Sequence, residues 1–207
     1  MKYKEEEYWN TGSHALGILL GVLGGYFMIR ETWDQGALVL FAVCVYHLSI
    51  VLLFTASTTY HAVADPRVKH KWRILDHISI YYLIAGTYTP VALITLVDDN
   101  GWLIFYVVWA IAIGGTVLKL FFTGKWEYLS LFLYLLMGWM IIFDINNLID
   151  LTSRLGLTLL FIGGAFYTLG IFFYAFKRIP YNHLIWHFFV LGGAISHWCY
   201  IYFAVVK

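Results

Sequence analysis

Seven long apolar stretches dominate this sequence of 207 residues. Each is about long enough for an α-helix to cross a hydrocarbon core of ~30 Å at ~1.5 Å per residue. They cover residues 14–30, 37–60, 74–97, 102–122, 128–143, 154–176 and 183–205. The chain is 61% hydrophobic and only 12% charged, so it has too few polar side chains to cover a water-soluble fold. The sequence therefore predicts an all-α, multi-pass integral protein of the cell membrane, a bundle of seven transmembrane helices.

The predicted division of the chain is simple. Residues 1–13 form a short cytoplasmic segment, and residues 14–207 form the transmembrane domain. The stretch at 128–143 is the shortest and has the least certain ends, and a six-helix count would require it to be re-entrant. The connecting loops are too short to hold a core of their own, so any function must reside in the bundle.

The distribution of Lys and Arg predicts the orientation, because basic residues are enriched in cytoplasmic loops. With the N-terminus inside, the outer segments hold only Arg30, Arg154 and Lys207. The inner segments hold all the other basic residues: Lys2, Lys4, Arg67, Lys69, Lys71, Arg73, Lys119, Lys125, Lys177 and Arg178. We therefore expect a cytoplasmic N-terminus and a C-terminus outside.

Charge and cysteine content exclude other classes of function. The net charge of +1 and the confinement of basic residues to inner loops argue against a nucleic-acid partner. Cys44 and Cys199 both fall within apolar stretches, where a thiol behaves as a small hydrophobe, so neither a disulfide nor a catalytic thiol is expected. No feature of the sequence specifies a protein partner.

Glycine and proline positions suggest how the helices pack. Gly17, Gly21 and Gly25 recur on one helix face, and three glycine pairs offer further small surfaces for close contact: Gly114-Gly115, Gly163-Gly164 and Gly192-Gly193. Pro90 lies inside the third stretch, where the missing backbone donor should kink the helix.

Polar residues that could bind a metal gather at one predicted depth. His61 ends the second stretch on the inner side, Asp76 begins the third, and His183 begins the seventh. His187 lies four residues after His183, which places both imidazoles on one helix face. Three histidines are the protein ligands of many catalytic zinc sites, with water in a fourth position. Asp76 is then a candidate base for that water, and Ser57, one turn before His61, a candidate hydrogen-bond partner for water or a substrate carbonyl.

Each polar residue also has a structural interpretation. A histidine near the headgroups can simply be an interface residue, and the pair lacks the Glu of His-Glu-x-x-His. His47 and His197 lie too far along their helices to bind the same ion, so we favour hydrogen bonds in the core over a proton path.

Three further polar residues fall close to one face at the start of the first helix: Glu7, Asn10 and His14. They either support the metal ligands or cap the site from the cytosol. A solvated helix start is the alternative interpretation.

These motifs together resemble the progestin and adipoQ receptor superfamily. The S-x-x-x-H, D and H-x-x-x-H pattern of that superfamily is matched in order by Ser57-Thr-Thr-Tyr-His61, by Asp76 and by His183-Leu-Ile-Trp-His187, with His197 beyond it. The opening Glu7-x-x-Asn10-x-x-Ser13-His14-x-x-Gly17 is similar to the first motif of its bacterial-type hemolysin III branch.

The resemblance implies a seven-helix bundle with the N-terminus inside and zinc bound by His61, His183 and His187. It places Asp76 near the zinc-bound water. It also implies hydrolysis of an amide bond in a lipid such as ceramide, and a role in membrane-lipid homeostasis. The long N-terminal domain of the animal receptors is missing from this sequence, so hormone sensing is not carried over.

Three functional hypotheses follow. The first is a zinc-dependent lipid amide hydrolase with a membrane lipid as substrate. The second is a metal-stabilised sensor or receptor for a lipid ligand, with the same zinc and no turnover. The third is a hemolysin-type cytolysin, which the sequence disfavours because its helices show no long polar stripe to line an aqueous pore.

Overall fold

The computed structural model describes residues 2–207, with side chains described from Glu5 onward. All regular structure in this part of the chain is helical. Seven of its helical segments are long and apolar enough to cross a membrane, as the sequence predicted. In chain order the elements are α1 (Lys2–Thr32), α2 (Ala37–Ala62), α3 (Pro66–Pro90), η1 (Val91–Thr95), α4 (Gly101–Phe122), α5 (Glu127–Gly138), η2 (Met140–Asp144), α6 (Ile145–Leu151), α7 (Arg154–Ala175), α8 (Asn182–Ile201) and η3 (Tyr202–Val206).

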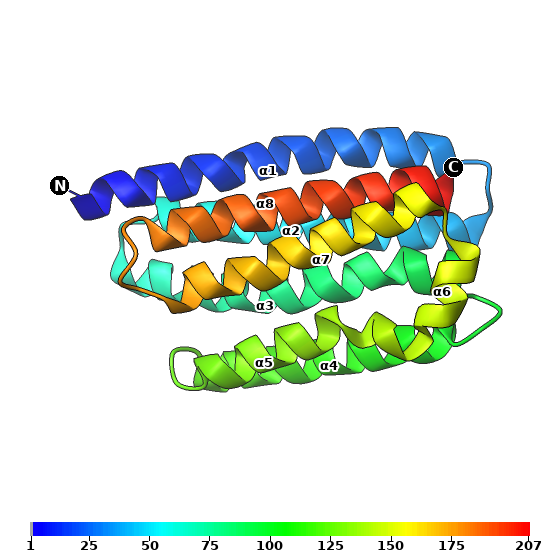
Figure 1. Cartoon of the computed structure of the whole chain (residues 1–207). Coiled ribbons are helices and arrows are strands. Elements are labelled where there is room, and N and C mark those ends of the chain that lie inside the picture. Colours follow the sequence, from blue (N-terminus) through cyan, green and yellow to red (C-terminus); the bar gives the residue numbers. More distant parts are fainter. Residues whose placement is uncertain (1) are drawn as a thin grey trace.

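The helices run roughly parallel to one another, and the two ends of the chain lie at opposite ends of the bundle (Figure 1). α2 packs between α1 and α3, α8 packs between α1 and α7, and the α4–α5 pair lies along the α3 side. An odd number of spans explains the separated termini. Which end faces the cytoplasm stays a prediction from the basic residues. Met1 of the expected segment 1–13 lies outside the described residues, and the rest of that segment is already part of α1.

The helical structure follows from the lipid environment of the apolar stretches. A backbone in lipid has no water to bond, so every N–H and C=O must find a partner inside the protein. The outward-facing side chains are apolar: Leu48, Phe121 and Phe143 are among the most exposed residues. The inward-facing core contains aromatic residues such as Tyr46 and Tyr81, both completely buried.

Glycines of α1 allow α2 to approach closely, as the sequence predicted. A Cβ on Gly17 would overlap the ring of Phe54, and one on Gly21 would lie 2.8 Å from Ile50. This register leaves the start of α1 beside the end of α2, at the level of His61.

A short, well-capped connection joins α2 to α3 at the same end of the bundle. The side chain of Asp65 accepts hydrogen bonds from the backbone N–H groups of Arg67 and Val68, and Pro66 occupies the first helical turn. Both the end of α2 and the start of α3 are therefore fixed near His61.

The fifth span differs from the sequence expectation. Instead of one helix at 128–143, the chain crosses at 127–151 as α5, a 3₁₀ segment and α6. Tyr88 of α3 supports the break: its hydroxyl donates to the carbonyl of Gly138 and accepts from the N–H of Ile141, both at 3.0 Å. Such side-chain partners are what allow a helix to break within a membrane. At Pro90 the helix type also changes, from α3 to the π-helical segment η1.

Candidate metal centre

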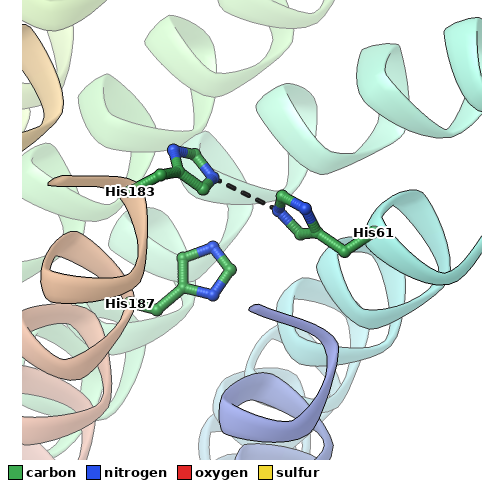
Figure 2. Close-up of side chains that lie close together, drawn as sticks. All are labelled: His61, His183 and His187. Carbon is green, nitrogen blue, oxygen red and sulfur yellow. Dashed lines mark hydrogen bonds between the residues drawn. The ribbon is translucent and has the colours of Figure 1, made fainter. Parts of the chain in front are cut away.

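Three histidine side chains meet where α2 ends and α8 begins. His61 lies one residue before the end of α2, and His183 and His187 lie one turn apart at the start of α8. Figure 2 shows the three rings turned toward one another. One ring nitrogen of each lies within 4.8 Å of the nitrogens of the other two, and Nε2 of His61 is 3.2 Å from Nε2 of His183. The structure thus brings together the three histidines singled out from the sequence.

The hydrogen bond at Nδ1 of His61 leaves the lone pair on Nε2, the nitrogen that faces His183. Nδ1 donates to the carboxylate of Glu7, with Nδ1 and Oε2 3.0 Å apart. In a neutral imidazole the other nitrogen, Nε2, then carries the lone pair. Lys69 donates to the same Glu7 oxygen at 3.0 Å and to the carbonyl of Tyr60 at 3.0 Å. A carboxylate on the far nitrogen is the usual support for a metal-binding histidine.

His187 is held in the same tautomer by the first helix. Its Nδ1 lies 3.2 Å from the carbonyl oxygen of Asn10 and 3.1 Å from Oγ of Ser13. A carbonyl oxygen only accepts, so Nδ1 carries the proton and Nε2 the lone pair. The ring of His14 stacks on that of His187, with centroids 3.6 Å apart and planes inclined by 12°. Residues of α1 therefore orient two of the three histidines.

The distances fit a metal ion. Two nitrogens bound to one tetrahedral ion at ~2.0–2.1 Å lie about 3.3 Å apart, close to the 3.2 Å between His61 and His183. The 4.8 Å limit on the remaining pairs requires a closure of at most about 1.5 Å, within reach of small side-chain rotations. Imidazole suits zinc, copper, iron and nickel. The three residues can thus hold a transition metal with at least one coordination position left open.

Asp76 is not a member of this ligand group. Its carboxylate lies 3.6 Å from Nδ1 of His77. Nε2 of His77 lies 3.4 Å from the hydroxyl of Tyr174, whose ring centroid is 6.0 Å from that of His183. Asp76 is therefore linked to the centre through two other side chains, and its role as a base stays a prediction.

Ser57 lies one turn before His61, as its spacing requires, and is 2% exposed. Its role toward a substrate or water also stays a prediction.

The three polar residues predicted at the start of α1 all lie at the centre, in different ways. Glu7 contacts His61 with its side chain, Asn10 contacts His187 with its backbone carbonyl, and His14 stacks on a ligand ring. Asn10 and His14 are each 3% exposed, so a solvated helix start does not describe them.

Two partners were missed by the sequence analysis. Ser13 stands inside the motif that contains His14, and its spacing of three from Asn10 placed it on the same face. Lys69 stands in the first turn of α3 and gave no signal beyond its charge, because the contact with Glu7 depends on how α1 and α3 meet.

The two histidines that lie deeper in the bundle, His47 and His197, form hydrogen bonds within the core, which is the interpretation that the sequence favoured. His47 contacts the carbonyl of Val43 at 2.9 Å and accepts from Nε1 of Trp198 at 3.3 Å. Nε2 of His197 donates to the carbonyl of Leu160 at 3.2 Å. Neither belongs to the metal-binding group.

The sequence has clear relatives over its whole length. Residues 2–198 match the family model described as Haemolysin-III related. The chain is 39% identical to the Hemolysin-3 homolog of Bacillus subtilis (strain 168), over 98% of this chain and 96% of that protein. It is 38% identical to Hemolysin-3 of Bacillus cereus, over 99% and 94%, and 29% identical to the human Monocyte to macrophage differentiation factor, over 93% and 83%. With its seven membrane-length helices, this chain belongs to the hemolysin III-related family of multi-pass membrane proteins.

Proposed function

We propose that this protein is a zinc-dependent hydrolase that cleaves an amide bond in a membrane lipid of the ceramide class and so contributes to membrane-lipid homeostasis. The observation that carries the proposal is a three-nitrogen centre together with an apolar cavity whose lining reaches Trp186, the residue before His187. A metal with an open position suits hydrolysis, and an apolar cavity suits the acyl chain of a lipid.

The cavity has a volume of about 100 Å³ and lies between α3, α5, α7 and α8. Its wall begins at Trp186, the residue before His187, and follows α8 to His197. Eleven residues of helix correspond to about 16 Å. Leu83, Ile84 and Val190 are typical of its aliphatic lining. A chain in this cavity would place its polar end near the histidines.

The residues around the centre have separable tasks in this proposal. When bound, zinc supplies a Lewis acid that polarises the amide carbonyl and lowers the pKa of water toward ~7. Glu7 keeps Nε2 of His61 directed at the ion. Asp76 accepts a proton on its carboxylate, reached from the centre by way of His77 or a water molecule. The hydroxyl of Ser57 hydrogen-bonds the carbonyl oxygen or the water.

The test is fatty-acid release from ceramide and other lipid amides by the purified, zinc-loaded protein. Asp76→Asn removes the proton acceptor while preserving size, so we expect release to fall by at least about 100-fold with zinc content unchanged. Asp65→Asn is the matched control, because Asp65 only caps α3.

Full activity in Asp76→Asn would remove that residue from the mechanism. Zinc retention without release from any lipid amide would contradict the hydrolase and favour a metal-stabilised sensor. Leakage of liposomes that persists after loss of both His183 and His187 would favour a cytolysin.

A further inference from the structure

Two buried polar atoms without partners among the described residues belong to residues that line the cavity. These are Nδ1 of His197 on α8 and the hydroxyl of Tyr167 on α7. Both residues line the cavity, and their ring centroids lie 5.4 Å apart. A buried polar atom without a hydrogen bond costs roughly 1–3 kcal/mol, so such a pair calls for a ligand group.

The other hydroxyl groups of the lining are all engaged. Those of Thr87 and Tyr134 donate to the carbonyls of Leu83 and His77. The hydroxyl of Tyr88 donates to the carbonyl of Gly138 at the break in the fifth span, and the hydroxyl of Thr168 accepts from Nε1 of Trp139. Tyr167 is therefore the exception among the lining hydroxyls of the described chain.

The hydrogen bond at the far side of His197 determines what its free nitrogen can bind. Nε2 faces the carbonyl of Leu160, which only accepts, so Nε2 carries the proton. Nδ1 of the neutral ring is then an acceptor and needs a donor. The Tyr167 hydroxyl can donate in turn. A hydroxyl group satisfies both residues, whereas a carbonyl or ester oxygen has no proton to give to Nδ1.

We propose that the pair His197 and Tyr167 recognises a hydroxyl group on the acyl chain of the lipid bound in this cavity. The proposal deepens the proposed function, on which it rests for the orientation of the lipid, by stating which acyl chains the site prefers. The pair lies about 15 Å along α8 from His187, so the hydroxyl must stand well down the chain from the polar end.

Reciprocal glycines hold the two rings in place. A Cβ on Gly163 of α7 would overlap the ring of His197, and a Cβ on Gly193 of α8 would lie 2.8 Å from the ring of Tyr167. Each helix thus provides a small residue opposite the polar ring of the other. This packing fixes the positions of both polar atoms.

Water alone is a poorer occupant. A single water needs roughly 10–15 Å³, whereas the cavity measures about 100 Å³. A second cavity of about 60 Å³ shares several of its lining residues, His197 among them. The aliphatic and aromatic remainder of the wall favours an apolar chain. A chain with one hydroxyl matches both parts of the lining.

Equilibrium binding tests the proposal. The full-length protein in lipid nanodiscs is titrated with stearic acid and with hydroxystearic acids whose hydroxyl occupies successive carbons. We expect one position to bind about tenfold more tightly than stearic acid, the effect of one or two additional buried hydrogen bonds. Tyr167→Phe should reduce this preference to about threefold or less.

Tyr200→Phe is the matched control, because Tyr200 has another buried hydroxyl without a partner among the described residues but lines neither cavity. It should keep the tenfold preference. Gly163→Ala provides a second perturbation should Tyr167→Phe fold poorly, since the atoms nearest to the added Cβ belong to the His197 ring.

Equal binding of all the acids to the wild type, or no binding of any, would overturn the proposal and leave a buried water as the partner of the pair. Equal loss of preference in Tyr200→Phe and Tyr167→Phe would also overturn it. The proposed hydrolase activity can be refuted independently of this site. Hydroxyl-selective binding without release of fatty acid would support the binding site and contradict turnover.

Discussion

The carboxylate of Glu7 lies 3.0 Å from Nδ1 of His61, so the first helix of the chain orients a candidate metal ligand at the end of the second. The same helix contacts His187 through Asn10 and Ser13. The metal-binding group contains no residue of α1, yet two of its three histidines owe their tautomers to that helix. The start of α1 accordingly contacts two of the three candidate ligands.

The first prediction concerns metal content. The double variant His183→Ala, His187→Ala leaves one imidazole, which is too few to retain an ion through purification. We expect near one zinc per wild-type chain and less than about one tenth of that in the variant, by plasma mass spectrometry. His70→Ala, which removes an exposed histidine, should keep its metal. Wild-type protein that folds without metal would contradict the assignment.

The second prediction concerns Glu7. Glu7→Gln keeps the shape of the side chain but removes the negative charge opposite Nδ1 of His61, so zinc affinity should fall roughly 10–100-fold. Competition with a chelator of known affinity measures it. Glu5→Gln changes an exposed carboxylate on the same helix and should have no effect. Equal affinities for all three proteins would show that the Glu7 contact is only structural.

The third prediction concerns the break in the fifth span. Tyr88→Phe leaves the carbonyl of Gly138 and the N–H of Ile141 without their partner. The expected loss of stability is about 1–2 kcal/mol, seen as a lower midpoint of thermal unfolding in detergent. Tyr82→Phe, on the same helix and without such bonds, is the comparison. An unchanged midpoint would mean that the broken span re-pairs its own backbone.

The fourth prediction separates two adjacent glycines of α4. A Cβ on Gly115 would lie 2.5 Å from the ring of Tyr81, whereas one on Gly114 has nothing within 4 Å. Gly115→Ala should therefore destabilise the bundle by about 1–3 kcal/mol through overpacking. Gly114→Ala should be neutral or slightly stabilising, because alanine is the better helix former. The same unfolding measurement decides, and equal effects would contradict the packing described for α4 against α3.

The sequence was sufficient to predict the seven spans and the meeting of His61, His183 and His187, because lipid thickness sets the length of each span and span order sets the depth of its ends. The structure brings these three histidines together in a group that could hold a metal ion. The same one-dimensional argument could place Asp76 at the right end, but not determine whether its side chain turns toward the ligands.

Tertiary structure decided which side chains touch. The hydrogen bond from Lys69 to Glu7, the stacking of His14 on His187 and the support of a broken span by Tyr88 join residues far apart in the sequence. These contacts depend on the rotation and register of neighbouring helices, which are set by small residues and side-chain packing rather than by hydrophobicity. The length of the apolar stretches determined where the chain crosses the membrane. Packing between the helices determined which side chains come together at the candidate site.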